Sequence, residues 1–272
     1  SQADQNSFVV YGYGEPLLID SGYYDWYGSP HDVGYTRQTK AHNDLLVNGT
    51  GQPVWDKGAT GSITRYFSSR PVDYTCGDAT PAYKGALQTF QRHILYLRPD
   101  VFVLLDEVKT DTPSEFTWAL HALERMQLED SKQEVTVLRG DSRCQVRFLT
   151  PQQLRFELTD QFTPPPTTPR ANQWHLYATT ATKATSAVFV TVVHPWRPGE
   201  TGPLDLQTRR EGDRMLISWP GGSAKLWIGP ADKLPAGESR FTLSGDWQPG
   251  RLATAMVDGT RLSVETAGGA RT

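Results

Sequence analysis

The residues best suited to chemistry lie in one stretch, residues 19–52, between two apolar runs. Its polar part ends on the pair His42-Asn43, and Arg37 and Lys40 stand shortly before that pair. An imidazole changes its charge near neutral pH, and a guanidinium binds a carboxylate or sulfate through two parallel hydrogen bonds. These residues make the stretch the candidate site. The alternative is a solvated loop with one incidental histidine.

The same stretch is rich in aromatic side chains. Loops of this length inside a compact domain are usually functional or disordered, and aromatic residues argue against disorder. The aromatic side chains before His31 are Tyr23, Tyr24, Trp26 and Tyr27. They either stack on sugar rings or form a small core that holds the loop in place. His31 lies in the same loop and is a candidate substrate contact.

The flanking segments are expected to be β-strands that position this loop. Residues 8–11 and 16–19 are apolar runs on either side of a Gly-rich turn, a pattern that predicts a hairpin. Residues 44–47 form a further apolar run, which ends at Asn48-Gly49. That dipeptide is typical of tight hairpin turns, so we expect a strand that leaves the loop and turns back at once.

The rest of the chain predicts an all-β protein, a large antiparallel β-sandwich with almost no helix. Short alternating segments are separated by turn residues at fairly regular spacing, which is typical of sandwiches. No amphipathic pattern exceeds about two helical turns. Residues 101–105 are continuously apolar, which predicts a central strand buried on both faces. The Pro-rich segment 162–169 is expected to be an extended surface loop.

Composition narrows the functional classes. The net charge of −3, from 27 basic and 30 acidic residues, is too mild and mixed for a nucleic-acid footprint. No run approaches the roughly 18 apolar residues of a membrane span. No signal peptide is recognisable, and the chain opens at Ser1 as though inside a motif. We therefore expect the chain to belong to a longer protein.

The two cysteines and the remaining histidines have structural interpretations. Cys76 and Cys144 form no CxxC motif or Cys/His cluster, which argues against a finger-type zinc site. They either form one disulfide or remain free as small core residues. His121 is expected in the core, and His175, which alternates with apolar neighbours, is expected to face solvent. His194 is expected to close a strand.

Several short motifs, in this order and spacing, resemble the heparinase II/III-like family of polysaccharide lyases. The motifs are Ala3-Asp4-Gln5-Asn6-Ser7-Phe8, Leu18-Ile19-Asp20-Ser21-Gly22, Ala41-His42-Asn43, Val47-Asn48-Gly49, Gly77-Asp78-Ala79-Thr80 and Trp118…Leu120-His121. The resemblance extends to about residue 125, and the remainder fits as generic β-strands. It implies that residues 1–272 form a single supersandwich-like domain, and that the family's N-terminal α/α toroid lies outside this chain.

The resemblance also implies an activity, β-elimination on uronic-acid polysaccharides such as heparan sulfate or alginate. That reaction must neutralise the uronate carboxylate, remove the C5 proton and protonate the leaving O4. The family is expected to supply Tyr, Asn and His from the toroid and one His from the sandwich, for which His42 is the best match. The isolated chain would then lack a complete site. The candidate substrate contacts around His42 are Trp26, His31, Tyr35, Arg37, Lys40 and Asn43.

Some family members also hold a structural zinc in a His-Asp-His set. Here the candidate ligands are His42 and His93, with no Asp at a matching spacing. The cofactor question therefore stays open between no cofactor and a structural zinc.

Three functions follow from these patterns. The first is the C-terminal domain of a lyase, the second is a non-catalytic carbohydrate-binding or structural sandwich, and the third is a uronate C5-epimerase module. No hydrolase, zinc-protease or phosphate-loop motif competes with them. The expected partners are an acidic polysaccharide and the toroid of the same protein, and the expected location is periplasmic or secreted. The choice of polysaccharide and the oligomeric state stay open.

Overall fold

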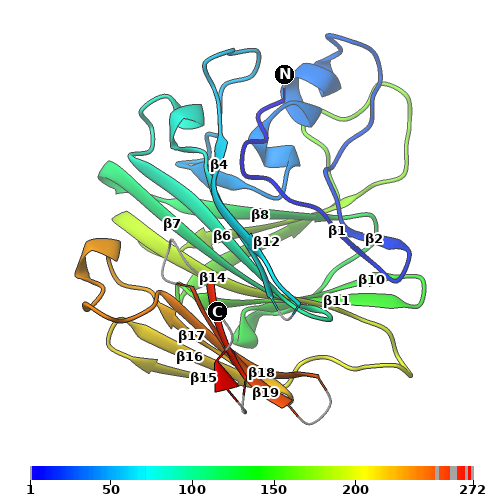
Figure 1. Cartoon of the computed structure of the whole chain (residues 1–272). Helices are drawn as coiled ribbons and strands as arrows, with labels where there is room; N and C mark the ends of the chain where they lie inside the picture. The colour runs from blue at the N-terminus through cyan, green and yellow to red at the C-terminus, as the bar shows by residue number, and fades with distance from the viewer. Residues whose placement is uncertain (1, 71, 249–250, 258–261, 267–268, 271–272) are drawn as a thin grey trace.

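The fold is built from antiparallel β-sheets in three layers (Figure 1). The computed structural model describes residues 2–70, 72–248, 251–257, 262–266 and 269–270. The middle layer is an eight-stranded sheet. In spatial order its strands are β4 (Ser62–Ser68), β5 (Val72–Asp78), β6 (Thr89–Leu97), β7 (Val101–Ser114), β14 (Ala184–Trp196), β11 (Ser142–Thr150), β10 (Glu134–Arg139) and β9 (Gln127–Glu129).

Each face of the central sheet is covered by another sheet. A four-stranded sheet packs on one face, with strands β12 (Leu154–Thr159), β13 (Trp174–Thr180), β8 (Phe116–Ala122) and β3 (Leu45–Val47). A seven-stranded sheet packs on the other, with strands β15 (Gln207–Glu211), β16 (Arg214–Trp219), β17 (Gly222–Trp227), β18 (Phe241–Gln248), β19 (Arg251–Val257), β20 (Leu262–Thr266) and β21 (Gly269–Ala270). All described pairings are antiparallel, as the turn-rich sequence predicts.

The alternation of side chains along a strand divides the interior into two hydrophobic cores. In β7, Leu104 packs into the first core, against the four-stranded sheet, whereas Val103 and Leu105 pack into the second core. The prediction that residues 101–105 form a strand buried on both faces is confirmed. The sequence of such a strand is continuously apolar because neither of its faces contacts water.

The two elements that flank the candidate loop are also confirmed. Strands β1 (Val10–Gly12) and β2 (Glu15–Leu18) form the expected hairpin. Strand β3 ends in a tight turn in which Asn48 and Gly49 have φ angles of 51° and 75°. Two successive residues with positive φ are what a type I′ hairpin turn requires.

Helical structure among the described residues is limited to five short turns. They are η1 (Asp32–Thr36), η2 (Thr39–Ala41), η3 (Thr80–Tyr83), η4 (Asp130–Lys132) and η5 (Ala231–Lys233). The structure thus confirms an all-β sandwich with almost no helix. In the described part of the chain, no helix is long and apolar enough to cross a membrane.

The Pro-rich segment differs from the sequence-based expectation, and the structure decides between the two alternatives for the cysteines. The Pro-rich segment 162–169 is not purely a surface loop, because Phe162 is only 7% exposed and packs beneath the candidate loop. Cys76 and Cys144 are both buried and free, and they lie in different cores, so no disulfide joins them.

Candidate functional site

The candidate loop between β2 and β3 folds back on itself through η1 and η2. Its start is tied to its end, because the Ser21 N–H donates to the Ala41 carbonyl over 2.8 Å. Gly22 lies where the chain passes closest to η1. It has a φ of +105°, and a Cβ atom there would approach the Thr36 methyl group to 2.4 Å. A residue other than glycine would therefore disturb the loop.

His42 is positioned by Asp20, at the other end of the loop. The His42 Nδ1 lies 3.0 Å from the Asp20 carboxylate, and the His42 side chain is 1% exposed whereas that of Asp20 is 47% exposed. The carboxylate can only accept, so Nδ1 carries the proton and donates. Nε2 is buried and has no hydrogen-bond partner in the described structure. The pair therefore presents one imidazole nitrogen whose bonding capacity is unused.

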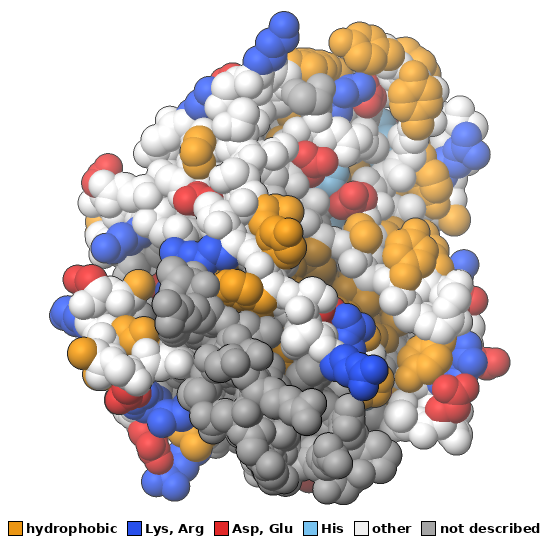
Figure 2. Space-filling view, in the orientation of Figure 1, with side chains coloured by type: hydrophobic (Ala, Val, Ile, Leu, Met, Phe, Trp, Pro, Cys, Tyr) orange, Lys and Arg blue, Asp and Glu red, His pale blue; other side chains and the backbone are white. Residues whose placement is uncertain are grey.

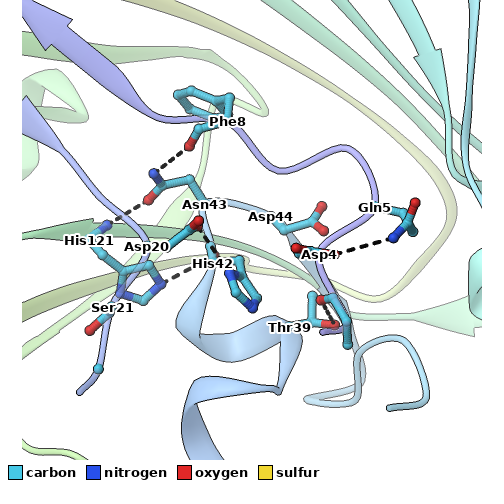
Figure 3. A network of polar contacts seen from close by, with 12 residues as sticks. Asp4, Gln5, Phe8, Asp20, Ser21, Thr39, His42, Asn43, Asp44 and His121 are labelled. Carbon is cyan, nitrogen blue, oxygen red and sulfur yellow. Dashed lines mark hydrogen bonds and ion pairs between the residues drawn. The ribbon is translucent and has the colours of Figure 1, made fainter. Parts of the chain in front are cut away.

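Asn43 fixes the exit of the loop rather than presenting its amide at the surface (Figure 3). Its side-chain nitrogen donates to the Phe8 carbonyl over 2.7 Å, and its oxygen accepts from the His121 N–H over 2.8 Å. Asn43 is a candidate substrate contact in the sequence analysis, but in this structure both ends of its amide are bound to backbone groups.

A buried ion pair holds the backbone at Asn43, next to His42, in place. Arg92 on β6 donates to both Asp106 oxygens on β7, over 2.8 and 2.7 Å, and a further Arg92 nitrogen donates to the Asn43 carbonyl over 2.9 Å. The Trp118 indole also donates to Asp106 over 2.7 Å. Bidentate pairs of this kind are directional, so the backbone beside His42 is held by the rigid central sheet.

Two neutral imidazoles lie under the loop. The His121 Nε2 donates to the His42 carbonyl over 3.2 Å. Because a neutral imidazole has only one N–H, the His121 Nδ1 is an acceptor, and it accepts from the His175 Nδ1, 3.0 Å away. The Tyr35 hydroxyl lies 3.0 Å from that His175 nitrogen and donates to Ser21. Burial lowers the pKa of His121 well below its usual value and that of His175 to about 4. Both rings are therefore uncharged at neutral pH.

These positions test two sequence predictions. The core position of His121 is confirmed. The solvent-facing position of His175 is wrong, because His175 is fully buried. Strand β13 has the sandwich core on one face and the candidate loop on the other, so alternation along this strand does not separate buried from exposed side chains.

His31 and Tyr35 belong to the interior of the loop. The His31 Nδ1 donates to the Pro164 carbonyl over 2.7 Å, and its Nε2 accepts from the Tyr23 N–H over 3.2 Å. The rings of His31 and Tyr35 stack at 5.3 Å, and Phe162 meets both edge-on. Both side chains are buried, so in this structure neither is presented to a substrate.

The remaining candidate contacts differ in exposure. Lys40 donates to the Thr163 carbonyl over 2.6 Å, and partial burial lowers its pKa. Arg37 is 13% exposed and pairs with Asp32 over 2.9 Å. Burial raises the pKa of Asp32, but hydrogen bonds from the Gly28 amide and Arg37 outweigh burial, so that pKa lies below its usual value. Trp26, 50% exposed, is the most accessible of the six candidates.

A shared metal site of His42 and His93 is not formed. Successive side chains on β6 point to opposite faces, and Arg92 points toward His42. His93 therefore points into the second core, where its Nδ1 lies 2.9 Å from the Tyr74 hydroxyl. Within the described ranges, no group of three or more His, Cys, Asp or Glu side chains is arranged to hold a metal ion. The donors present therefore do not fit a zinc site.

Two sets of contacts between charged or polar side chains could not be found from the sequence. Asp20 was quoted only as part of a motif, and its contact with His42 spans 22 residues. In the second core His93 lies 3.8 Å from Glu107, and Arg240 on the seven-stranded-sheet side lies 2.5 Å from the same carboxylate. No local signal connects such distant positions.

Comparisons with known proteins agree with this architecture. A family model described as "Heparinase II/III-like, C-terminal" matches residues 1–220. A comparison with curated proteins gives no match. Among solved structures, a heparinase III gene product has a TM-score of 0.67 at 15% identity and covers 83% of this chain and 36% of its own.

Two further structures are similar. The heparan sulfate lyase HepC from Pedobacter heparinus has a TM-score of 0.67 at 14% identity, over 85% of this chain and 37% of its own. A heparinase III structure has a TM-score of 0.66 at 17% identity, over 83% of this chain and 35% of its own. The likeness at these identities shows the fold. The chain spans little more than a third of the length of these proteins.

Proposed function

The chain belongs to the heparinase II/III-like family, and we propose that it is the C-terminal sandwich of a lyase that cleaves a uronic-acid polysaccharide by β-elimination. The family match over residues 1–220 and the similar fold of heparinase III and heparan sulfate lyase structures support this. Because the chain spans little more than a third of those proteins, we propose that an N-terminal α/α toroid of the same protein completes the active site.

The observation that carries the proposal is the unused Nε2 of His42. A buried polar atom without a hydrogen bond costs about 1–3 kcal/mol, so its presence calls for an explanation, and a catalytic role is one such explanation. Asp20 fixes the tautomer in which this nitrogen carries the lone pair, because its carboxylate accepts a hydrogen bond from the His42 Nδ1. His42 is therefore prepared to accept a proton at Nε2.

This chemistry matches one requirement of β-elimination. The C5 proton of a uronate is weakly acidic, its removal places charge on the adjacent carboxylate, and O4 leaves with a proton. In the proposal His42 supplies one of the two proton transfers. Groups from the toroid supply the other transfer and neutralise the carboxylate. Asp20 acts as a positioning residue, since it contacts His42 and not the reacting atoms.

The test is the ultraviolet absorbance of the unsaturated uronate formed by the intact protein from heparan sulfate, alginate or polygalacturonate. His42→Ala should lower turnover by about 10²–10⁴, the usual contribution of one acid–base group. Asp20→Asn should lower turnover, because an amide does not hold the proton on the His42 Nδ1 as the carboxylate does. Tyr66→Ala, an exposed change on β4, is the control and should leave turnover unchanged.

Four outcomes would overturn parts of the proposal. Wild-type turnover in His42→Ala would remove His42 from the mechanism, and a large loss of melting temperature would assign it a structural role. Exchange of the C5 proton with deuterated solvent, without new absorbance, would indicate an epimerase. Binding of the polysaccharide without exchange or absorbance would indicate a carbohydrate-binding sandwich.

We also propose a periplasmic or secreted location, because acidic polysaccharides of this class lie outside the cytoplasm. Fractionation of the native host with detection of the protein tests it. Recovery in the cytoplasmic fraction alone would refute it.

A further inference from the structure

Exposed aromatic side chains gather on the loops around η1, which lies at the top of the molecule in Figures 1 and 2. Figure 2 shows hydrophobic side chains there with basic and acidic side chains beside them. The large exposed residues in these loops are Tyr24 at 70%, Trp26 at 50%, Tyr27 at 70% and Trp55 at 44%. The buried interior of the loop uses other aromatic residues, so these four side chains are not needed to hold it together.

Two of these rings lie close to the same cation. The Arg37 guanidinium carbon lies 5.1 Å from the ring centre of Tyr27 and 5.5 Å from that of Trp55. Both distances are within the range of cation–π attraction. We call Tyr27, Arg37 and Trp55 the Arg37 surface. It joins the loop before His42 to the segment after β3.

The Arg37 guanidinium in this surface is held in one position, but some of its hydrogen-bond donors are unused. Its Nε donates to Asp32, which is itself held by the Gly28 N–H over 2.9 Å and approached by the Thr36 hydroxyl. The two terminal nitrogens have no hydrogen-bond acceptor among the described residues. A guanidinium presents its donors in a planar fork that matches a carboxylate or sulfate. Asp32 therefore orients a donor pair that is free to bind an anion.

The conformation of Trp55 is also unusual. Its φ angle is +57°, a left-handed value that bulky side chains rarely adopt. The surrounding turn keeps the indole half-exposed beside Arg37 instead of burying it. Such backbone conformations persist where the rest of the structure imposes them, and they concentrate at binding sites.

We propose that the Arg37 surface is a subsite for one acidic sugar residue of the polysaccharide, an inference that rests on the proposed function. The sugar ring lies against the faces of Tyr27 or Trp55, and its carboxylate or sulfate accepts hydrogen bonds from the terminal nitrogens of Arg37. A neutral sugar would use only the rings and leave the guanidinium without a partner. The aromatic rings and the guanidinium together therefore favour an anionic sugar over a neutral one.

The test measures KM, kcat and binding in the intact protein with heparan sulfate oligosaccharides, polygalacturonate and alginate, and with dextran as the neutral polymer. Arg37→Met keeps an apolar side chain beside the rings and removes the charge. It should weaken binding and raise KM by roughly ten- to a hundredfold, the usual effect of losing hydrogen bonds to a charged group. Tyr27→Ala and Trp55→Ala should raise KM by about tenfold, as loss of an aromatic anchor does.

Controls separate a binding role from a structural one. Tyr66→Ala removes an exposed aromatic ring on β4 and should leave KM unchanged. The kcat values should change little, because none of the three residues is assigned a proton transfer. The Arg37 variant should also show a weaker salt dependence of binding than the wild-type protein, since salt screens the attraction between the guanidinium and an anionic polymer.

The two proposals fail in different ways. If the intact protein releases unsaturated uronate and all three variants keep the wild-type KM, the subsite is refuted and the lyase stands. If no unsaturated product forms but Arg37→Met abolishes binding of an acidic polymer, the lyase is refuted and the subsite stands. If hydroxyl-radical footprinting finds Tyr27 and Trp55 shielded in the intact, unliganded protein, the surface is an internal contact and the subsite is refuted.

Discussion

The neutral imidazole pair under the candidate loop should make the protein sensitive to acid. His175 is fully buried, its Nδ1 is shared with His121 and Tyr35, and burial lowers its pKa to about 4. An unfolded histidine titrates near 6.5. Because the folded pKa is the lower one, the unfolded chain binds the proton first. Stability is complete above about pH 6.5 and falls as the pH drops toward 4.

The magnitude follows from these two pKa values. Linkage gives a loss from His175 of about 2 kcal/mol at pH 5 and about 3 kcal/mol at pH 4, relative to pH 7.5. Burial also lowers the pKa of His121 well below its usual value, so its contribution has the same sign. Losses of this size are a large fraction of the 5–15 kcal/mol that stabilise a typical domain.

The measurement compares the wild-type protein with His175→Gln. Gln retains an amide that can donate to His121 but does not titrate. The variant should be less stable than the wild type at pH 7.5, and that difference should shrink by about 2 kcal/mol at pH 5. Urea denaturation at both pH values gives the free energies of unfolding. The double difference cancels the carboxylates that titrate in both proteins.

A constant difference between the two proteins at pH 7.5 and pH 5 would refute the reasoning. It would mean that His175 is not held neutral by burial. Titration of the imidazole resonances by nuclear magnetic resonance provides an independent reading, in which His175 should remain neutral down to a pH of about 4.

Two further changes probe the cores. Leu104→Ala, in the strand that both cores share, should lower the free energy of unfolding by about 2–5 kcal/mol, and a change below about 0.5 kcal/mol in urea denaturation would be a surface-like effect. Asp106→Ala leaves Arg92 buried without its partner and should cost about 3–5 kcal/mol. Restoration of stability by the double change to Arg92→Met and Asp106→Ala would support this explanation, and equal destabilisation by single and double changes would contradict it.

Much of the fold could be predicted from local patterns, because most strands show an apolar side chain at every second position. The short polar strands β9 and β15 were missed. All five residues of β15 are exposed, so neither of its faces leaves an apolar signature. Its position at the edge of the seven-stranded sheet depends on its pairing with β16, which local sequence does not reveal.

The position of the candidate loop between two strands could be predicted from the sequence, but the contacts of its side chains could not. The sequence could not show that Phe162 and Pro164 come from a distant segment to cover His31 and Tyr35. Contacts between distant segments determine which aromatic side chains are buried and which are exposed. The exposed ones include Trp55, which lies outside the loop.

The buried pair of Arg92 and Asp106 has a consequence for how the strands find their partners. A one-residue slip between two strands normally exposes apolar side chains to water, but β7 is apolar toward both cores and a slip there would exchange one apolar environment for another. Arg92 and Asp106 stand directly opposite each other in the β6–β7 ladder. An alignment that separated them would remove the hydrogen-bonded partner that these two buried charges have in each other, and a buried charge without its partner costs several kcal/mol. The charged pair therefore encodes the register that the hydrophobic pattern of this sheet leaves ambiguous.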